Sequence, residues 1–441
     1  MDKISASIIT IGDELLIGQT IDTNSAWMAE ELNKICVWVK RRLAVGDVWD
    51  DIWNALDEER KQADIILITG GLGPTADDIT KPLLCKYFGG KLIVNEQVLA
   101  HVKYLFEKVF RRPGPILERN LKQAEVPDVC TALMNERGTA PGMWFEAPSK
   151  SSALGGETFE DSDRKIFVSL PGVPNEMKGL MKKEVLPRLQ QHFEMPVIHH
   201  QTFLTYGIGE SFLAEKIKDW EESLPSNFKL AYLPHYGNVR LRITATGDNQ
   251  NKLERELEER SESLKPLIKE WMVADDDMTI QQVVAKLLKE RKQTVGTAES
   301  CTGGYIAHLL TIDPGASSNF KGTVVAYDNK VKEDMLGVSH DTIESTGAVS
   351  EDTVRQMAEG TLKQLKTDYA IATSGIMGPD GGSEHKPVGT VWIAVGNNKK
   401  VEAQLFHFRF DRLRNIEQSS HTALNLLRKF ILQNRDYQDS K

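Results

Sequence analysis

The alternation of apolar and polar positions predicts a parallel α/β sheet at the start of the chain. Residues 4–11 have the composition of a strand, and residues 24–33 and 50–63 repeat apolar positions at helical spacing. Residues 64–69 form a continuous apolar run, the pattern of a strand buried on both faces. Because strands and helices alternate, we expect neighbouring strands to run parallel.

A later strand and helix complete this first unit. Residues 165–170 are mostly apolar, and the sequence Pro-Gly-Val-Pro after them leads into a helix for which Asn175 is the expected cap. Residues 147–163 are rich in serine, glycine and acidic side chains. We expect them to form an exposed, mobile loop.

The pattern changes in the middle of the chain. Strands are expected at residues 199–205, 230–233 and 239–245, followed by a long charged helix at residues 253–271. This order predicts a small α+β module. Residues 273–278 break the periodicity with three adjacent aspartates, which indicates a linker.

A second α/β pattern follows the linker. A helix at residues 279–293, a strand at residues 294–298 and a helix at residues 303–310 begin it. Further strands at residues 322–327, 369–373 and 390–395 are interleaved with helices. The whole chain of 441 residues is long enough for three domains. We expect them at residues 1–190, 191–272 and 279–435.

Charge and apolar content narrow the functional classes. The net charge is −9, which opposes a broad surface for nucleic acid or anionic lipid. Apolar runs are far shorter than the roughly 18 residues that span a bilayer. The start of the chain lacks the pattern of a signal peptide, so we expect a cytoplasmic protein without nucleic-acid or membrane partners. The four cysteines show neither zinc-site nor disulfide spacing.

Three polar loops of the first unit follow predicted strands, at residues 12–14, 70–78 and 169–176. The carboxyl ends of parallel strands meet at one edge of a sheet, where ligands bind. Glycine-rich backbone and the Thr75 hydroxyl can contact a phosphate. The acidic side chains can hold a divalent cation, and the candidate ligands are Asp13, Asp77 and Asp78.

A structural explanation of these loops is also available. The glycines can simply form tight turns, and Asp77 or Asp78 can cap the next helix. Three such loops in one domain favour a ligand site, although they do not identify the ligand.

A second candidate site begins at Ser300, between a predicted strand and a predicted helix. A hydroxyl at a helix N-terminus lies near unpaired N–H groups and the positive end of the helix dipole, which suits a nucleophile. The alternative is that Ser300 only caps the helix. Cys301 is a rival nucleophile, because the same position would lower its pKa. Lys330 and Lys332 follow another strand that ends at the same edge of the sheet. A lysine desolvated at this edge could act as a base toward the serine. The alternative is that both lysines are solvated surface groups.

The first unit resembles the molybdopterin-binding-like domain of the CinA proteins. The resemblance rests on the stretches IGDELLIGQTIDTN, TGGLGPTADDIT, GTAPG and SLPGVPNEM within residues 1–189. It implies hydrolysis of ADP-ribose to AMP and ribose 5-phosphate with a divalent metal ion, held by the three aspartates named above. It also implies substrate contacts by Glu14, Asn24, Gly70, Gly71, Thr75, Pro171 and Gly172. The middle module resembles the KH-like module of these proteins, but it lacks a basic flank for RNA.

The last domain is similar to the CinA C-terminal domain, a PncC-like nicotinamide mononucleotide deamidase that needs no cofactor. The matching stretches are TAESCTGG, GAVS, SGIMGPDGG and KPVGTVW. The resemblance implies that Ser300 is the nucleophile and Lys332 its general base. Arg412 would bind the substrate phosphate, whereas a second family arginine falls at Ile416. The remaining implied substrate contacts are Thr302, Gly303, Gly304, Tyr327, Asn329, Ser374 and Gly375.

The resemblance of the two domains implies a bifunctional nucleotide hydrolase of pyridine-nucleotide salvage that acts on nicotinamide mononucleotide and ADP-ribose. The resemblance also implies a homodimer. The alternative is a non-catalytic nucleotide- or pterin-binding protein that works through partners in competence or the DNA damage response.

Overall fold

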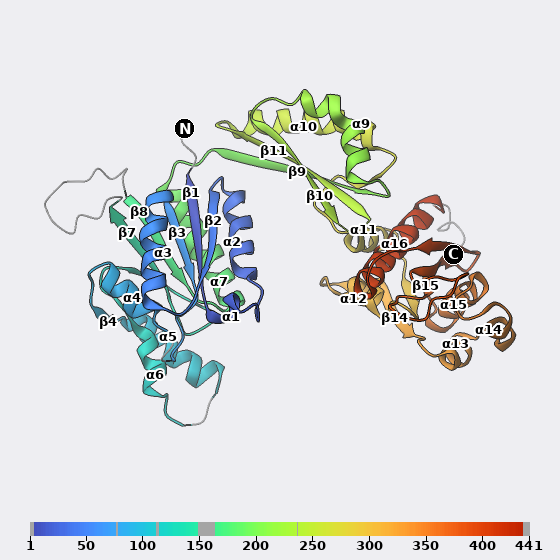
Figure 1. The fold of residues 1–441 in the computed structure, drawn as a ribbon, viewed down its shortest axis with the longest axis horizontal. Coiled ribbons are helices and arrows are strands. Elements are labelled where there is room, and N and C mark those ends of the chain that lie inside the picture. The colour runs from blue at the N-terminus through green and yellow to red at the C-terminus, as the bar shows by residue number, and fades with distance from the viewer. Residues whose placement is uncertain (1–3, 76–77, 112–113, 149–163, 236, 435–441) are drawn as a thin grey trace. The chain divides into compact units, whose positions relative to one another are not determined.

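The computed structural model describes residues 4–75, 78–111, 114–148, 164–235 and 237–434, which form two compact units (Figure 1). One unit contains the chain up to residue 199 together with residues 246–250. The other contains residues 200–245 and the chain from residue 251 onward. Most of the loop expected to be mobile, from residue 149 to 163, lies outside the described residues.

A six-stranded sheet with the order β2-β1-β3-β8-β7-β6 forms the core of the first unit. β1 (Ser5–Ile11) pairs in parallel with β2 (Trp38–Val45) and β3 (Ile65–Thr69), and β3 pairs in parallel with β8 (Arg164–Leu170). β7 (Gly142–Pro148) and β6 (Thr131–Leu133) are antiparallel additions. Every position of β3 is buried, which explains its continuous apolar sequence.

Helices cover both faces of this sheet. Apolar side chains of α2 (Thr23–Lys34) and α7 (Pro174–Leu180) pack on one face, and those of α3 (Trp49–Gln62) and α4 (Thr80–Tyr87) pack on the other. α7 begins at Pro174 and not after an Asn175 cap, because proline already has the backbone angle of a first helical turn. A π-helical turn and α8 (Leu186–His192) extend α7.

A helical excursion leaves the sheet between residues 92 and 127, and the sequence did not predict it. α5 (Glu96–Tyr104) continues into a π-helical turn (Leu105–Val109). α6 (Glu118–Leu121) and a short 3-10 turn (Lys122–Ala124) then lead back to the sheet. The short strands β4 (Leu92–Val94) and β5 (Glu125–Pro127) pair at the base of the excursion.

The middle module is a four-stranded sheet with the order β10-β11-β9-β12. Its elements are β9 (Val197–Tyr206), α9 (Glu210–Glu222), β10 (Phe228–His235), β11 (Asn238–Gly247), α10 (Gln250–Ile268) and β12 (Met272–Ala274). β12 pairs with β9, so the residues expected to form a linker begin inside the sheet.

The C-terminal sheet has the order β14-β13-β15-β16-β17. β13 (Val295–Glu299) pairs in parallel with β14 (Phe320–Val325) and β15 (Tyr369–Gly375), and β16 (Thr390–Asn397) and β17 (Lys400–His407) follow as antiparallel strands. One face is covered by α11 (Ile280–Glu290), α12 (Tyr305–Thr311) and α16 (Arg412–Gln433). The other is covered by α13 (Asn329–Leu336), α14 (His340–Thr346) and α15 (Glu351–Leu365).

The fold is therefore mixed α/β, with a small α+β module between two α/β domains. In the part of the chain that the structure describes, no helix has both the length and the apolar composition needed to cross a bilayer.

Candidate active sites

Three parallel strands of the C-terminal sheet end beside one another, and the loops after them carry the expected site residues. The N–H of Ser300 donates to the carbonyl of Thr373 (3.0 Å), and the N–H of Ala326 donates to the carbonyl of Glu299 (2.9 Å). These hydrogen bonds continue the sheet one residue past β13 and β14. The loops that carry Ser300 and Tyr327 therefore start side by side, as the sequence predicted.

The N-terminus of α12 is occupied by a buried carboxylate that the sequence analysis missed. Glu299 is 0% exposed and accepts hydrogen bonds from the N–H groups of Gly304 (3.0 Å), Ile306 (3.0 Å) and Ala307 (2.8 Å). The expectation that Ser300 faces unpaired helix N–H groups is therefore wrong, and so is the alternative that Ser300 caps the helix. A glutamate at the buried end of a strand was the available signal.

The hydroxyls of two expected substrate contacts, Thr302 and Ser374, are buried and bond to other parts of the protein. Thr302 is 2% exposed, and its hydroxyl lies 2.8 Å from both Glu299 Oε2 and Thr373 Oγ1. Ser374 is 1% exposed and donates to the carbonyl of Ala348 (2.6 Å), in the GAVS stretch. Both hydroxyls fasten neighbouring loops together.

The glycines of this edge are required by the backbone. Gly303 and Gly304 have φ values of +60° and +97°, which favour glycine. A Cβ at Gly375 would lie 2.7 Å from the carbonyl oxygen of Thr390, in the neighbouring strand. The backbone of the loops therefore requires glycine at these positions whether or not a ligand contacts them.

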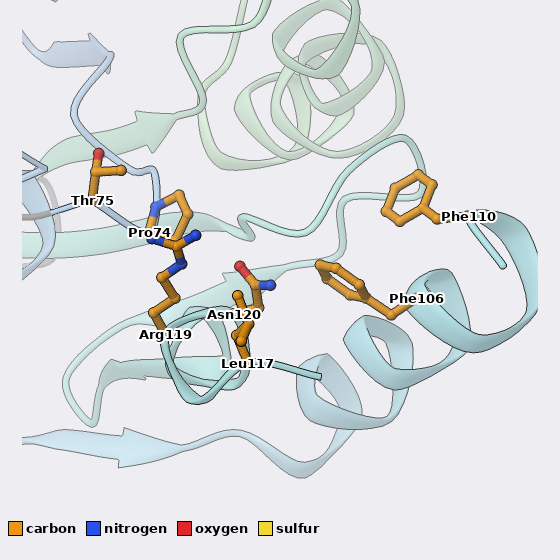
Figure 2. A pocket seen from close by; sticks show the side chains of 7 residues that line it. All are labelled: Pro74, Thr75, Phe106, Phe110, Leu117, Arg119 and Asn120. Carbon is orange, nitrogen blue, oxygen red and sulfur yellow. The ribbon is translucent and has the colours of Figure 1, made fainter. Parts of the chain in front are cut away.

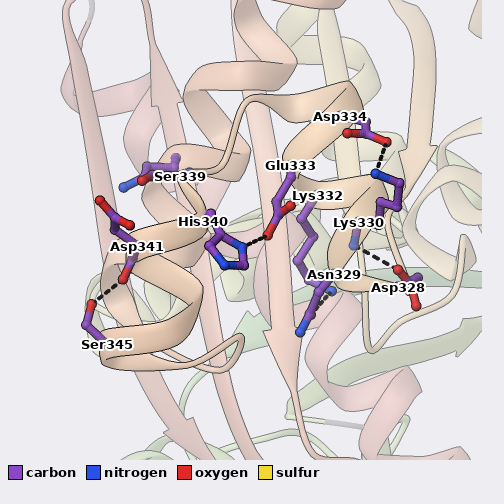
Figure 3. Close-up of polar contacts among 11 residues, drawn as sticks. Asp328, Asn329, Lys330, Lys332, Glu333, Asp334, Ser339, His340, Asp341 and Ser345 are labelled. Carbon is purple, nitrogen blue, oxygen red and sulfur yellow. Dashed lines mark hydrogen bonds and ion pairs between the residues drawn. The ribbon is translucent and has the colours of Figure 1, made fainter.

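The sequence could not tell whether Lys330 or Lys332 is desolvated, and the structure shows that Lys332 is the buried one (Figure 3). It is 1% exposed, and its Nζ donates to the carbonyl of Tyr327 (3.0 Å) and to Asn329 Oδ1 (3.4 Å). Lys330 is exposed and pairs with Asp334 at 3.3 Å. The structure thus assigns the solvated role to Lys330 and brings Lys332 to the end of β14.

Burial shifts the proton affinity of two groups in opposite directions. Desolvation lowers the pKa of Lys332, and the Asp328 carboxylate opposes this shift. Desolvation raises the pKa of Cys301 to about 12, which opposes the thiolate form that a nucleophilic cysteine needs. Lys332 Nζ is bonded to the Tyr327 carbonyl, and β14, which precedes Tyr327, pairs with β13, which precedes Ser300.

Arg412 joins two loops of the C-terminal site. Its Nη1 donates to the carbonyl of Gly378 (2.8 Å), and its Nη2 donates to the Tyr327 hydroxyl (3.3 Å). Tyr327 is 64% exposed, so this pair lies at the solvent side of the site. A guanidinium and a phenol hydroxyl in this position suit an anionic ligand group.

Ile416 occupies the position at which the resemblance implies a second arginine, and it has a packing role in this chain. Ile416 is partly buried and packs against the apolar core of the C-terminal domain. Arg414 lies two residues earlier, and its Nε is 3.5 Å from Asp411 Oδ2 at the exposed start of α16.

The loops of the first unit also converge at one edge of the sheet. Asn24 Nδ2 donates to the carbonyl of Gly172 (2.7 Å), and the Thr69 hydroxyl donates to the carbonyl of Pro171 (2.9 Å). Gly70 has a φ of +115°, and a Cβ there would lie 2.2 Å from the carbonyl oxygen of Ile11. Three strand ends therefore meet, as predicted. Within the described residues, the buried Oδ1 of Asn24 has no hydrogen-bond partner.

Asp78 closes the glycine loop on itself. Its carboxylate accepts hydrogen bonds from the N–H groups of Gly73 (2.7 Å) and Thr75 (2.9 Å) and from the Thr75 hydroxyl. Gly71 packs against Thr80, where a Cβ would lie 2.1 Å from the threonine hydroxyl oxygen. Loop donors expected to contact a phosphate are thus already bonded within the loop.

Asp13 pairs with a residue that the sequence analysis did not single out. Asp13 Oδ1 accepts from the N–H of Asp47 (3.2 Å), and the N–H of Asp13 donates to Asp47 Oδ2 (3.3 Å). The Glu14 carboxylate folds over Gly12, where a Cβ would lie 2.6 Å from Glu14 Oε1. The loop at residues 12–14 is therefore bonded to the segment that directly follows β2.

The described carboxylates do not form a metal site. Within the described residues, no group of three or more His, Cys, Asp or Glu side chains is placed to hold an ion. Asp78 uses both oxygens within its own loop, and Asp77 lies outside the described residues. We therefore assign no reaction step to a metal ion.

Comparison with known proteins agrees with this architecture. Residues 7–191 match the probable molybdopterin binding domain, residues 200–274 the damage-inducible protein CinA KH domain, and residues 277–431 the CinA C-terminal domain. A CinA-like protein of Flavobacterium psychrophilum is 44% identical over 98% of this chain and 99% of its own length. The chain belongs to the CinA family.

Two further proteins are similar to this chain, one over nearly its full length and one over about a third of it. A CinA-like protein of Cytophaga hutchinsonii is 44% identical over 97% of this chain and 98% of its own length. A solved CinA superfamily protein of Klebsiella pneumoniae is 33% identical, covers 35% of this chain and 96% of its own, and has a TM-score of 0.34.

Proposed function

We propose that the C-terminal domain is a serine amidohydrolase that converts nicotinamide mononucleotide to nicotinate mononucleotide. The observation that carries the proposal is the burial of Lys332, whose Nζ donates to the Tyr327 carbonyl just past the end of β14, the strand that pairs with β13 and so lies beside the strand that leads into Ser300. Desolvation favours the neutral amine, which is the form that can accept a proton.

The chain's own residues supply each step. Ser300 Oγ attacks the carboxamide carbon while its proton passes to Lys332 Nζ. The C–N bond then breaks, and the proton on Lys332 leaves with the amide nitrogen as ammonia. Water attacks the ester, Lys332 takes a proton from it, and that proton returns to Ser300 Oγ as the nicotinate product leaves. In this proposal Arg412 and the Tyr327 hydroxyl hold the substrate phosphate.

A pair of neighbouring variants tests the nucleophile. Ser300→Ala should abolish ammonia release from nicotinamide mononucleotide, whereas Cys301→Ala should retain most of it. Both positions are buried, so circular dichroism must first show that each variant is folded. The reverse pattern of activities would overturn the serine assignment.

For the N-terminal domain we propose hydrolysis of ADP-ribose, with water, to AMP and ribose 5-phosphate. The convergence of Asn24, Gly70 and Gly172 at one sheet edge supports a nucleotide site there. The resemblance implies a divalent cation, which we retain as part of the proposal without assigning its ligands. A function that uses both domains would make the chain a bifunctional enzyme of pyridine-nucleotide salvage.

Chromatography of the products tests this second activity. The purified chain should release AMP from ADP-ribose, and Asn24→Ala should reduce the rate. Parallel reactions with magnesium, with manganese and with EDTA test the cation. Retention of unchanged ADP-ribose on the protein would favour the binding role instead. We further propose a cytoplasmic homodimer, and analytical ultracentrifugation tests the dimer.

A further inference from the structure

A cavity of about 500 Å³ lies between the glycine loop and the helical excursion of the first unit (Figure 2). Pro74 and Thr75 of the loop form one part of its lining. The excursion supplies the rest, namely Phe106, Phe110, Leu117, Arg119 and Asn120. The cavity therefore adjoins the edge at which the strands of the first sheet end.

Two phenylalanines form an aromatic wall. The ring centroids of Phe106 and Phe110 are 5.5 Å apart, and their planes meet at 87°. Phe110 is 46% exposed, and both rings lie on the side of the cavity opposite Arg119 (Figure 2). Exposed aromatic faces beside a concave surface are suited to stacking on a flat ligand ring.

The opposite wall is fastened to the glycine loop. Lys81 Nζ donates to the carbonyls of Lys122 (3.3 Å) and Gln123 (3.1 Å). Gln123 is 2% exposed, and its Nε2 donates to the carbonyl of Leu72 in the loop (3.3 Å). The segment that carries Arg119 and Asn120 is therefore held against the loop before a ligand binds, which lowers the entropic cost of binding.

The polar groups of this wall indicate the kind of ring. The Asn120 amide offers a donor and an acceptor side by side, the pattern that matches the N6 and N7 edge of adenine. Hypoxanthine presents two acceptors at the same edge and cannot satisfy that pair. Arg119 adds a cation that can contact a phosphate or stack on the base.

We propose that this cavity binds the adenine base of a nucleotide whose phosphate groups point toward the glycine loop. The base stacks on the exposed ring of Phe110, Phe106 contacts the base edge-on because its plane is nearly perpendicular to that of Phe110, and the Asn120 amide reads the N6 and N7 edge. The inference rests on the proposed nucleotide substrate of the N-terminal domain and names the part of the substrate that sets its specificity.

Calorimetric titration of the full-length chain with AMP, IMP and ribose 5-phosphate tests the proposal. AMP should bind about tenfold or more tightly than ribose 5-phosphate, since stacking on an aromatic side chain strengthens base binding to this degree. Phe110→Ala should remove most of this preference, and Phe110→Trp should keep it. Asn120→Ala should remove the preference for AMP over IMP.

Matched controls lie beside the cavity. Val109 is 52% exposed and adjoins Phe110 without lining the cavity, and Lys122 pairs with Glu118 at the surface. Val109→Ala and Lys122→Ala should leave all three affinities unchanged. The melting temperature of each variant shows whether it is folded.

The outcomes separate this inference from the proposed function. Equal binding of AMP and ribose 5-phosphate, or equal loss of both in Phe110→Ala, would overturn the base site even if ADP-ribose is hydrolysed. Binding of AMP that depends on Phe110 without hydrolysis would support the base site and contradict the activity. Dissociation of an oligomer by Phe110→Ala, without loss of the AMP preference, would identify the surface as a subunit contact and overturn the proposal.

Discussion

The carboxylate of Glu299 accepts a 3.0 Å hydrogen bond from the N–H of Ile306, seven residues later in the chain. The same carboxylate accepts from Gly304 and Ala307, so one buried side chain orders the whole turn after β13. The loop that carries Ser300 therefore depends on a residue that need not touch any substrate.

Replacement of Glu299 should loosen this turn. Glu299→Ala leaves three N–H groups without their acceptor, and each such loss costs about 1–3 kcal/mol. Hydrogen exchange of the Ile306 and Ala307 amides should accelerate strongly. Glu344→Ala, at an exposed position of α14, is the control and should leave these amides protected. Unchanged exchange in Glu299→Ala would show that the turn is held by other contacts.

The pH dependence of deamidation should report on Lys332. A general base must be neutral, so kcat/KM should rise with pH through the pKa of Lys332, which burial lowers. Asp328 raises that pKa, and therefore Asp328→Asn should move the rise to lower pH. Asparagine also caps helices well, so the Asp328 bond to the Lys330 N–H should be replaced. A rise that stays at the same pH would contradict the role of Lys332 as the base.

Arg412 should act mainly on substrate binding. Arg412→Ala removes the guanidinium next to the Tyr327 hydroxyl and should raise KM for nicotinamide mononucleotide about tenfold or more, with a smaller change in kcat. Arg414→Ala removes an exposed partner of Asp411 and should leave KM nearly unchanged. If Arg414→Ala has the larger effect on KM, the phosphate lies on the other side of α16.

Gly70 should tolerate no side chain. Gly70 and Gly18 both have positive φ, at +115° and +74°, but only Gly70 faces a close neighbour, the Ile11 carbonyl. Gly18→Ala should cost about 1 kcal/mol for the backbone conformation alone. Gly70→Ala should cost several times more, because the loop must also move away from β1. Calorimetric unfolding of the two variants compares them, and similar melting temperatures would contradict the close packing at Gly70.

His340 should titrate above its usual range. Its Nδ1 lies 2.8 Å from Glu333 Oε1 (Figure 3), and this hydrogen bond raises the pKa of the imidazole. A raised pKa in the folded state means that the stabilisation is fully present below the unfolded pKa of about 6.5. It is lost as pH rises through the folded value. NMR titration should show a lower midpoint in Glu333→Gln, and an unchanged midpoint would exclude the pair in solution.

The sequence predicted the two sheets and the meeting of their loops because strand periodicity determines where parallel strands end. Thr69 and Ser300 were expected at such ends, and the structure places them there. The choice between Lys330 and Lys332 needed the structure, since their burial depends on how α13 packs against α15.

Loop contacts could not be predicted in the same way. The bonds from the Asp78 carboxylate to Gly73 and Thr75, and the Asp13 pair with Asp47, depend on backbone angles that no periodic pattern encodes. The helical excursion was missed for a related reason. Its π-helical turn, the four-residue α6 and the three-residue 3-10 turn do not repeat apolar positions for long enough to be recognised.

The Asp78 carboxylate has a consequence for selectivity among anions. An anion that binds at Gly73 and Thr75 must first displace a tethered competitor, whose effective concentration is far higher than that of most dissolved ions. Small ions such as inorganic phosphate have no further contacts to compensate for this displacement. A larger molecule that also binds elsewhere on the protein can displace the Asp78 carboxylate. The loop should therefore bind such a molecule in preference to the abundant small anions of the cell.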